Sequence, residues 1–329
     1  MSRQKAYTIA LRKRKNGDRF LSDDSFSFVI PQINISKRYW MADPFLFEYL
    51  DKIYLFYELY DFIRARGVIA YSEIQNNGRL LTSPKIIINR PFHLSFPYIY
   101  KQNNRIYIMP ETAQRKSIQL FKAISFPNKW QDDKVLIDRV FACDSIFIDE
   151  PECSIILTSK MFDDSETDKV ISCYVNNRQF DISSKGSLNC TSIDCGVGEF
   201  GIRNAGKLFE YEGNIIRPGQ NCLNGMYGRG LVFWKVDSVT PYKEEVIKAF
   251  DVKEISKHVI NDNKNNNGII SGEDFIGCHT YNSCSKYEVV DLSYYTEVPE
   301  YYQRLHQIYR RIPFPSRCIR YIKRKFLRK

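Results

Sequence analysis

Three carboxylates stand in short segments beside strand-like runs, where they could carry out acid–base chemistry. Asp43 precedes Pro44, Glu111 follows Pro110, and Asp144 opens a β-branched and aromatic run. A positioned carboxylate can accept or donate a proton in a transition state. A following proline favours extended backbone at Asp43, which can aim its side chain toward the axis of a closed sheet. These three carboxylates are the candidate catalytic residues.

Basic, amide and aromatic side chains in neighbouring segments could bind a substrate. Arg203 and Arg217 offer the paired N–H groups that bind phosphate through two hydrogen bonds, and aromatic rings can stack on sugars. The candidate substrate- or phosphate-binding residues are His93, Arg203, Arg217, Gln220, Tyr227 and His279. In the structural alternative, the arginines pair with the candidate carboxylates and the aromatic rings fill the core. We predict no metal site, because no second ligand lies at suitable spacing from His279.

The elements that must position these residues are short strands. Aromatic and β-branched runs of strand length, such as 53–57, 105–109 and 231–234, alternate with turn residues, and helical periodicity is nearly absent before residue 240. Roughly four strands recur in every ~45 residues, which is the spacing of a β-propeller. We therefore predict an all-β fold with an N-terminal extension at 1–25, a propeller at 26–292 that includes a loop or insert at 241–268, and a tail at 293–329.

Charge separates the tail from the body. The chain of 329 residues has 48 Lys and Arg against 38 Asp and Glu, and ten of the basic residues, with no acidic one, lie in 301–329. The remainder is balanced, which argues against a nucleic-acid-binding face. Apolar and aromatic residues at helical spacing in the tail predict a basic amphipathic helix that binds anionic membrane through 300–329. A solubilising or partner-docking tail is the alternative.

Cysteine usage and hydropathy predict the compartment. The nine cysteines are scattered, odd in number and free of CxxC pairs, so we expect a reducing environment. No apolar run is long enough to span a membrane, and the first twenty residues lack the order of a secretory signal. These observations predict a cytoplasmic protein that lies peripherally on the inner face of the cell membrane.

The order of the motifs resembles that of a known family. Ala-Asp-Pro-Phe, His-Leu-Ser-Phe-Pro, Met-Pro-Glu, Phe-Pro-x-x-Trp, Arg-x-Ala-Gly, Arg-Pro-x-Gln and His-Thr follow one another between residues 38 and 285. This pattern resembles five-bladed β-propellers encoded in bacterial surface-polysaccharide gene clusters. It is also similar to the N-terminal domain of plant glucosamine inositolphosphorylceramide transferases and, distantly, to arabinanase and levansucrase propellers. Met41 and the tail depart from the pattern.

The resemblance implies a fold and a set of site residues. It implies five blades around a central pocket, with one Asp from the first blade, one Asp from a middle blade and a later Glu facing that pocket. Asp43 and Asp144 match the two aspartates in position and local pattern. Glu111 is the available acidic residue of the second blade, and Glu199 is a weaker candidate in the fourth.

Glycosyl transfer is the function that these features favour together. The expectation is a glycosyltransferase of bacterial capsule or O-antigen assembly, which moves a sugar, a furanose by analogy, from a nucleotide-activated donor to a lipid-linked glycan acceptor. A carboxylate would take the acceptor proton and arginines would stabilise the leaving diphosphate. No cofactor beyond the nucleotide sugar is expected. A furanosidase-like hydrolase and a non-catalytic glycan-binding propeller are the alternatives.

Overall fold

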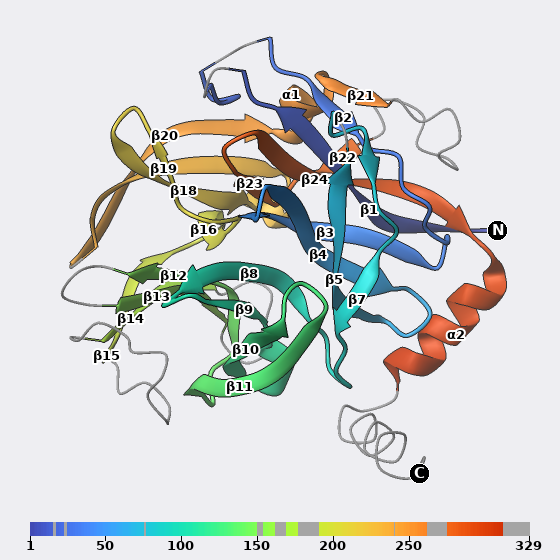
Figure 1. Cartoon of the computed structure of the whole chain (residues 1–329), viewed down its shortest axis with the longest axis horizontal. Coiled ribbons are helices and arrows are strands. Elements are labelled where there is room, and N and C mark those ends of the chain that lie inside the picture. The colour runs from blue at the N-terminus through green and yellow to red at the C-terminus, as the bar shows by residue number, and fades with distance from the viewer. Residues whose placement is uncertain are drawn as a thin grey trace.

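The computed structural model describes residues 1–15, 18–22, 25–75, 77–149, 154–161, 169–176, 191–239, 241–261 and 275–311. Strands dominate this part of the chain, and they form five sheets arranged around a common centre (Figure 1). The few helical elements described are α1 (Val252–Ser256), α2 (Glu300–Arg310) and the 3-10 turns η1 (Ala113–Arg115) and η2 (Leu223–Gly225). The prediction of an all-β, propeller-like fold is confirmed.

Four of the sheets are built from strands that follow one another along the chain. The first contains β3 (Tyr39–Tyr49), β4 (Lys52–Asp61), β5 (Arg66–Gln75), β6 (Leu80–Leu81) and β7 (Lys85–Ile88). The second contains β8 (Ser95–Gln102), β9 (Arg105–Glu111), β10 (Ser117–Ser125) and β11 (Lys129–Asp138). The third contains β12 (Ala142–Asp149), β13 (Ser154–Met161), β14 (Lys169–Asn176) and β15 (Thr191–Val197). The fourth contains β16 (Phe200–Asn204), β17 (Phe209–Tyr211), β18 (Asn214–Asn221), β19 (Gly230–Val239) and β20 (Tyr242–Asp251).

The fifth sheet joins the two ends of the chain. Strand β1 (Ser2–Lys13) pairs antiparallel with β24 (Tyr287–Val298) along its whole length (Figure 1). The other strands of this sheet are β2 (Phe28–Ile30), β21 (Val259–Asn261), β22 (Phe275–Gly277) and β23 (Tyr281–Ser283). The predicted boundaries are therefore corrected: the extension at 1–25 contributes a sheet strand, and β24 runs past residue 292. Strand pairing between chain ends is non-local, so sequence periodicity does not reveal it.

Both faces of the middle strands are covered, which explains their nearly continuous apolar sequence. In β4, Tyr54 and Phe56 belong to one core cluster, whereas the intervening Leu55 and Tyr57 belong to another. Successive side chains of a strand point to opposite faces, and here each face packs against a neighbouring sheet. Tight turns connect these strands: Asn103 and Asn104, with φ of 49° and 59°, link β8 to β9 as a two-residue hairpin of the type I′ kind.

Two further predictions about organisation need correction. Strand β20 and helix α1 occupy the first part of the predicted loop at 241–268, and residues 262–274 lie outside the described part. Helix α2 forms in the predicted tail, but it is not strongly basic, since it carries Arg304 and Arg310 against Glu300. It packs on the body, because His306 stacks on Phe62 at 4.5 Å between ring centroids. Residues 312–329, which hold most of the basic side chains, lie outside the described part.

Candidate functional site

β-Bulges in the first strands of three successive sheets turn residues toward the centre. The pairing register shifts between Ala42 and Phe45 in β3, and equivalent shifts occur in β8 and β12. Asp43, Phe96 and Asp144 lie in these bulges with φ of 49°, 44° and 51°. A bulge re-aims a side chain in this way and bends its strand. The expectation of extended backbone at Asp43 was therefore wrong, because the bulge places this residue in the left-handed region, which aspartate tolerates better than most residues.

The bulged strands border one central cavity of about 780 Å³. It brings together most of the predicted site residues, although they come from separate sheets. Those that line it are Asp43, His93, Glu111, Asp144, Glu199, Arg203, Tyr227 and His279. Glu58, Tyr7 and Trp40 also line the cavity; Glu58 and Tyr7 were missed as site residues. Glu58 had a usable signal: it is a lone charged residue within the apolar run of β4.

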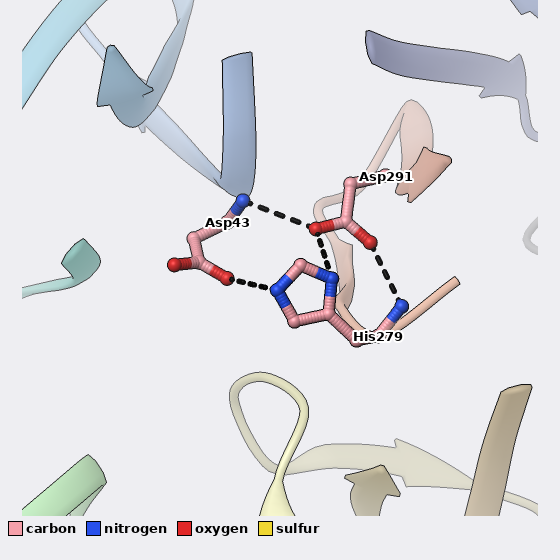
Figure 2. A group of neighbouring side chains, drawn as sticks. All are labelled: Asp43, His279 and Asp291. Atoms are coloured by element: carbon pink, nitrogen blue, oxygen red, sulfur yellow. Dashed lines mark hydrogen bonds and ion pairs between the residues drawn. The ribbon is translucent and has the colours of Figure 1, made fainter. Parts of the chain in front are cut away.

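A buried triad of Asp43, His279 and Asp291 lies at one wall of the cavity, which Asp43 and His279 line (Figure 2). His279 Nε2 lies 3.2 Å from Asp43 Oδ1, and Nδ1 lies 2.7 Å from Asp291 Oδ2. Burial opposes a charge on the imidazole, but the two carboxylates outweigh it and raise the pKa of His279 to about 10. The pKa of Asp43 is lowered, because the bonds from His279 and Thr280 outweigh the effect of burial. At neutral pH the wall therefore holds an imidazolium between two carboxylates.

Asp43 also ties neighbouring sheets together. Its Oδ2 accepts a hydrogen bond from the backbone N–H of Phe96 at 3.0 Å, and its Oδ1 accepts one from Thr280 Oγ1 at 2.8 Å. Asp291 in turn accepts the N–H of Asp43 at 3.2 Å. These bonds hold the Asp43 carboxylate in a fixed orientation at the edge of the cavity.

The same triad has ligand types that metals use. Among the described residues, Asp43, His279 and Asp291 are the group whose ligand atoms all lie within 4.8 Å of one another. Both ring nitrogens of His279, however, already face a carboxylate oxygen. This geometry fits a closed ion-paired cluster, and a cation would have to take the place of the imidazole proton.

Asp144 lies across the cavity in a set of donors from the fourth sheet. Arg203 Nε and Nη2 both lie 2.6 Å from Asp144 Oδ2, and Gln220 Nε2 donates to the same oxygen at 3.0 Å. Burial raises the pKa of Asp144, and the contacts with Arg203 act in the opposite direction by stabilising the charged carboxylate. Arg203 is also positioned over the ring of Tyr227, 5.1 Å from its centroid. Asp144 and Arg203 thus form a buried ion pair that faces the cavity.

Glu111 is protonated at neutral pH. Burial and the nearby Asp144 raise the pKa of Glu111 to about 8, although Arg203 acts in the opposite direction. Arg203 Nη2 lies 3.6 Å from Glu111 Oε2. Because Asp144 takes the closer donors, the shared proton is assigned to Glu111. The cavity therefore contains a charged Asp43 and a neutral Glu111, which is the pairing that acid–base catalysis requires.

Glu58 and His93 form a second titratable pair at the cavity. Burial, reinforced by Asp43, raises the pKa of Glu58 well above its ordinary value. Burial lowers the pKa of His93 to about 4. His93 Nδ1 accepts the N–H of Gly67 at 2.9 Å, so its proton is on Nε2, which lies 3.6 Å from Glu58 Oε1. The neutral imidazole can therefore donate a hydrogen bond from Nε2.

Arg217 and Gln220 do not line the cavity, which corrects two predictions. Arg217 is fully buried, and its guanidinium bonds Glu244 at 2.6 Å and 2.7 Å as well as Gly201 O and Asn204. These bonds occupy the donors that phosphate would need, so Arg217 has a structural role, although its partner is Glu244 and not one of the candidate carboxylates. Gln220 is equally buried and contacts Asp144, which makes it a positioning residue and not a substrate ligand.

Fold and cavity together define a class: a propeller-like β protein with a carboxylate-lined central pocket. The catalytic domain of an α-L-arabinofuranosidase from Coprinopsis cinerea shares this fold over 82% of the chain and 98% of its own length, with a TM-score of 0.53 and 8% identity. An exo-β-1,3-galactanase from Phanerochaete chrysosporium covers 68% of the chain and 53% of its own length, with a TM-score of 0.51 and 9% identity. At these identities the likeness is one of fold.

Sequence comparison identifies the family. Residues 31–271 match the family described as glucosamine inositolphosphorylceramide transferase 1, N-terminal, and the chain belongs to this family. The protein of that name from Oryza sativa subsp. japonica is 30% identical over 207 residues, which are 62% of this chain and 27% of that protein. The protein from Arabidopsis thaliana is 27% identical over 206 residues, or 63% of this chain and 26% of that protein. The chain thus corresponds to about a quarter of these relatives.

Proposed function

We propose that the chain is a glycosyltransferase in which Asp43 accepts the proton of the acceptor hydroxyl. The observation that supports this most directly is the pairing of charged Asp43 with protonated Glu111 at one cavity. As the acceptor oxygen attacks the anomeric carbon, Asp43 takes its proton and the bond to the leaving group breaks. Glu111 hydrogen-bonds the departing oxygen, and burial together with the nearby Asp144 keeps Glu111 protonated.

The names of the relatives support the substrate classes of this proposal. They contain a sugar, glucosamine, and a phosphorylated lipid, inositolphosphorylceramide. We propose a nucleotide-activated donor and a lipid-linked glycan acceptor for this chain, within bacterial capsule or O-antigen assembly. Arg203 is the cavity arginine that can contact the leaving diphosphate, since the guanidinium of Arg217 is already paired with Glu244.

The proposed location is peripheral, on the cytoplasmic face of the cell membrane. Tyr301 and Ile308 are exposed on α2, 58% and 57% accessible, and they are seven residues apart on one helical face with Arg304 between them. The basic residues beyond α2 would add attraction to anionic lipid. Within the described residues, none of the helices is long and apolar enough to cross a membrane.

Hydrolysis is the second candidate, because an acid–base pair in a cavity of this size could equally activate water. The test is to incubate the protein with a panel of nucleotide sugars, with and without lipid-linked glycans from a bacterial extract, and to follow released nucleotide and labelled lipid. Transfer predicts labelled lipid that appears together with nucleotide. Release of free sugar alone, from glycans as well as from donors, would favour the hydrolase.

Asp43→Asn is the decisive variant, with Asp51→Asn as its matched control. Both positions have positive φ in or beside β3, but Asp51 is exposed in the turn to β4. We expect Asp43→Asn to abolish transfer and Asp51→Asn to leave it intact. Because Asp43 also binds His279 and Phe96, thermal unfolding is measured in parallel. A folded Asp43→Asn protein with full activity would refute the assignment of Asp43 as the base.

A further inference from the structure

A second cavity lies next to the central one, between the fifth and first sheets. Its volume is about 510 Å³, within the range of roughly 300–1,000 Å³ typical of ligand pockets. One wall is the face of β1 and β24 that carries Gln4, Thr8 and Thr296. Residues 31–37, which lead into β3, and the outer strand β6 form the other walls.

Two aromatic side chains separate this cavity from the central one and line both. Tyr7 and Trp40 have their ring centroids 5.0 Å apart. Tyr7 also lies 5.0 Å from His279, and Trp40 stacks on Tyr60 at 4.3 Å. The Nε1 of Trp40 is buried and has no hydrogen-bond partner among the described residues. A ligand that extends from the central cavity past this partition would enter the second cavity.

The side chains that line the second cavity are mostly neutral. The side chains that line the second cavity are amides, hydroxyls, aromatic rings and aliphatic groups, with Lys37 as the one charged group, and none of these described residues is acidic. Gln32 and Asn34 are exposed and present amide groups that can donate and accept. Flat aromatic faces together with amides and hydroxyls match a sugar, which has apolar C–H faces and a rim of hydroxyls.

We propose that the second cavity binds neutral sugar units of the acceptor glycan, distal to the hydroxyl that reacts. The link to an acceptor rests on the proposed glycosyltransferase function, whereas binding of neutral sugars by this cavity does not. Tyr7 and Trp40 would then contact the glycan on both sides of the partition, so the acceptor must be at least a disaccharide. A single neutral sugar would be a much weaker ligand than a short oligosaccharide.

The experiment uses a printed array of neutral and anionic oligosaccharides as the probe and the full chain as the protein. Two variants change the second cavity at exposed positions: Ser83→Trp fills it, and the Gln32→Ala, Asn34→Ala double variant removes its amides. Ser125→Trp, on the exposed end of β10 and outside both cavities, is the matched control. We expect binding to neutral oligosaccharides that both cavity variants lose and that Ser125→Trp keeps.

Asp43→Asn separates this proposal from the proposed function, because Asp43 lines only the central cavity. Array binding retained by Asp43→Asn and lost by Ser83→Trp supports the second cavity even if no transfer is ever detected. An array without neutral-glycan signal would overturn the proposal. Equal signals from Ser83→Trp and the wild type would do so as well, since the ligand would then lie elsewhere.

Discussion

Replacing Glu111 with glutamine should raise stability and remove a specific pH dependence. The native pKa of about 8 lies above the ordinary value of 4.5, so the folded protein binds a proton that the unfolded chain releases in this range. For an acid whose pKa is raised by folding, the free energy of unfolding falls as pH rises from 4.5 to 8. Each pKa unit corresponds to about 1.4 kcal/mol, which gives a cost of ~3 kcal/mol at pH 7.

The assay is urea unfolding of the wild type and of Glu111→Gln at intervals from pH 5 to pH 8.5. The variant should gain up to ~3 kcal/mol at pH 7, because glutamine keeps the neutral form that the cavity favours. The difference between the two proteins should grow by ~3 kcal/mol between pH 5 and pH 8. Glu210→Gln, at an exposed position, controls for the general effect of removing a negative charge.

A difference that stays flat across this range would refute the reasoning, since Glu111 would then be ionised in the folded protein at neutral pH. The pH dependence of activity tests the protonation state of Glu111 independently. Transfer by the wild type should decline above pH 8 as Glu111 loses its proton, and this decline should be absent from any residual activity of Glu111→Gln.

Further predictions concern the buried pairs and the tail. Asp291→Asn should lower the free energy of unfolding by ~3 kcal/mol, because it leaves the His279 imidazolium with one carboxylate; urea titration measures the loss. The stability that the His279 charge contributes is present below about pH 6.5 and should disappear as pH rises toward 10, so His279→Gln should show a smaller alkaline loss than the wild type. Arg217→Lys should destabilise the fold by ~3 kcal/mol yet leave the KM for the donor unchanged. A raised KM in a folded variant would show that Arg217 contributes to donor binding. Deleting residues 312–329 should keep α2 and the sheets but weaken co-sedimentation with anionic vesicles; equal sedimentation would contradict the membrane proposal.

Local patterns predicted the class of fold and most of the residues around the cavity. Strand-length runs and turn residues are local features, and the motifs around Asp43, Asp144 and Arg203 mark the strands that reach the centre. The role of Arg217 was not predictable, because it depends on Glu244, a partner on β20 that no motif marks and that is separated from β18 by β19. Asp291 was missed for a related reason: it is buried among apolar residues of β24, and its function depends on contacts with distant Asp43 and His279.

The pairing of β1 with β24 has a consequence for the synthesis of the protein. The ribosome delivers β1 long before β24, so β1 cannot find its partner until Val298 has left the exit tunnel. The Asp43 carboxylate likewise lacks its contacts until His279 and Asp291 have been synthesised. A chain that stops before β24 therefore has no assembled acid–base site. Under the proposed function, fragments that end before Asp291 should be catalytically silent.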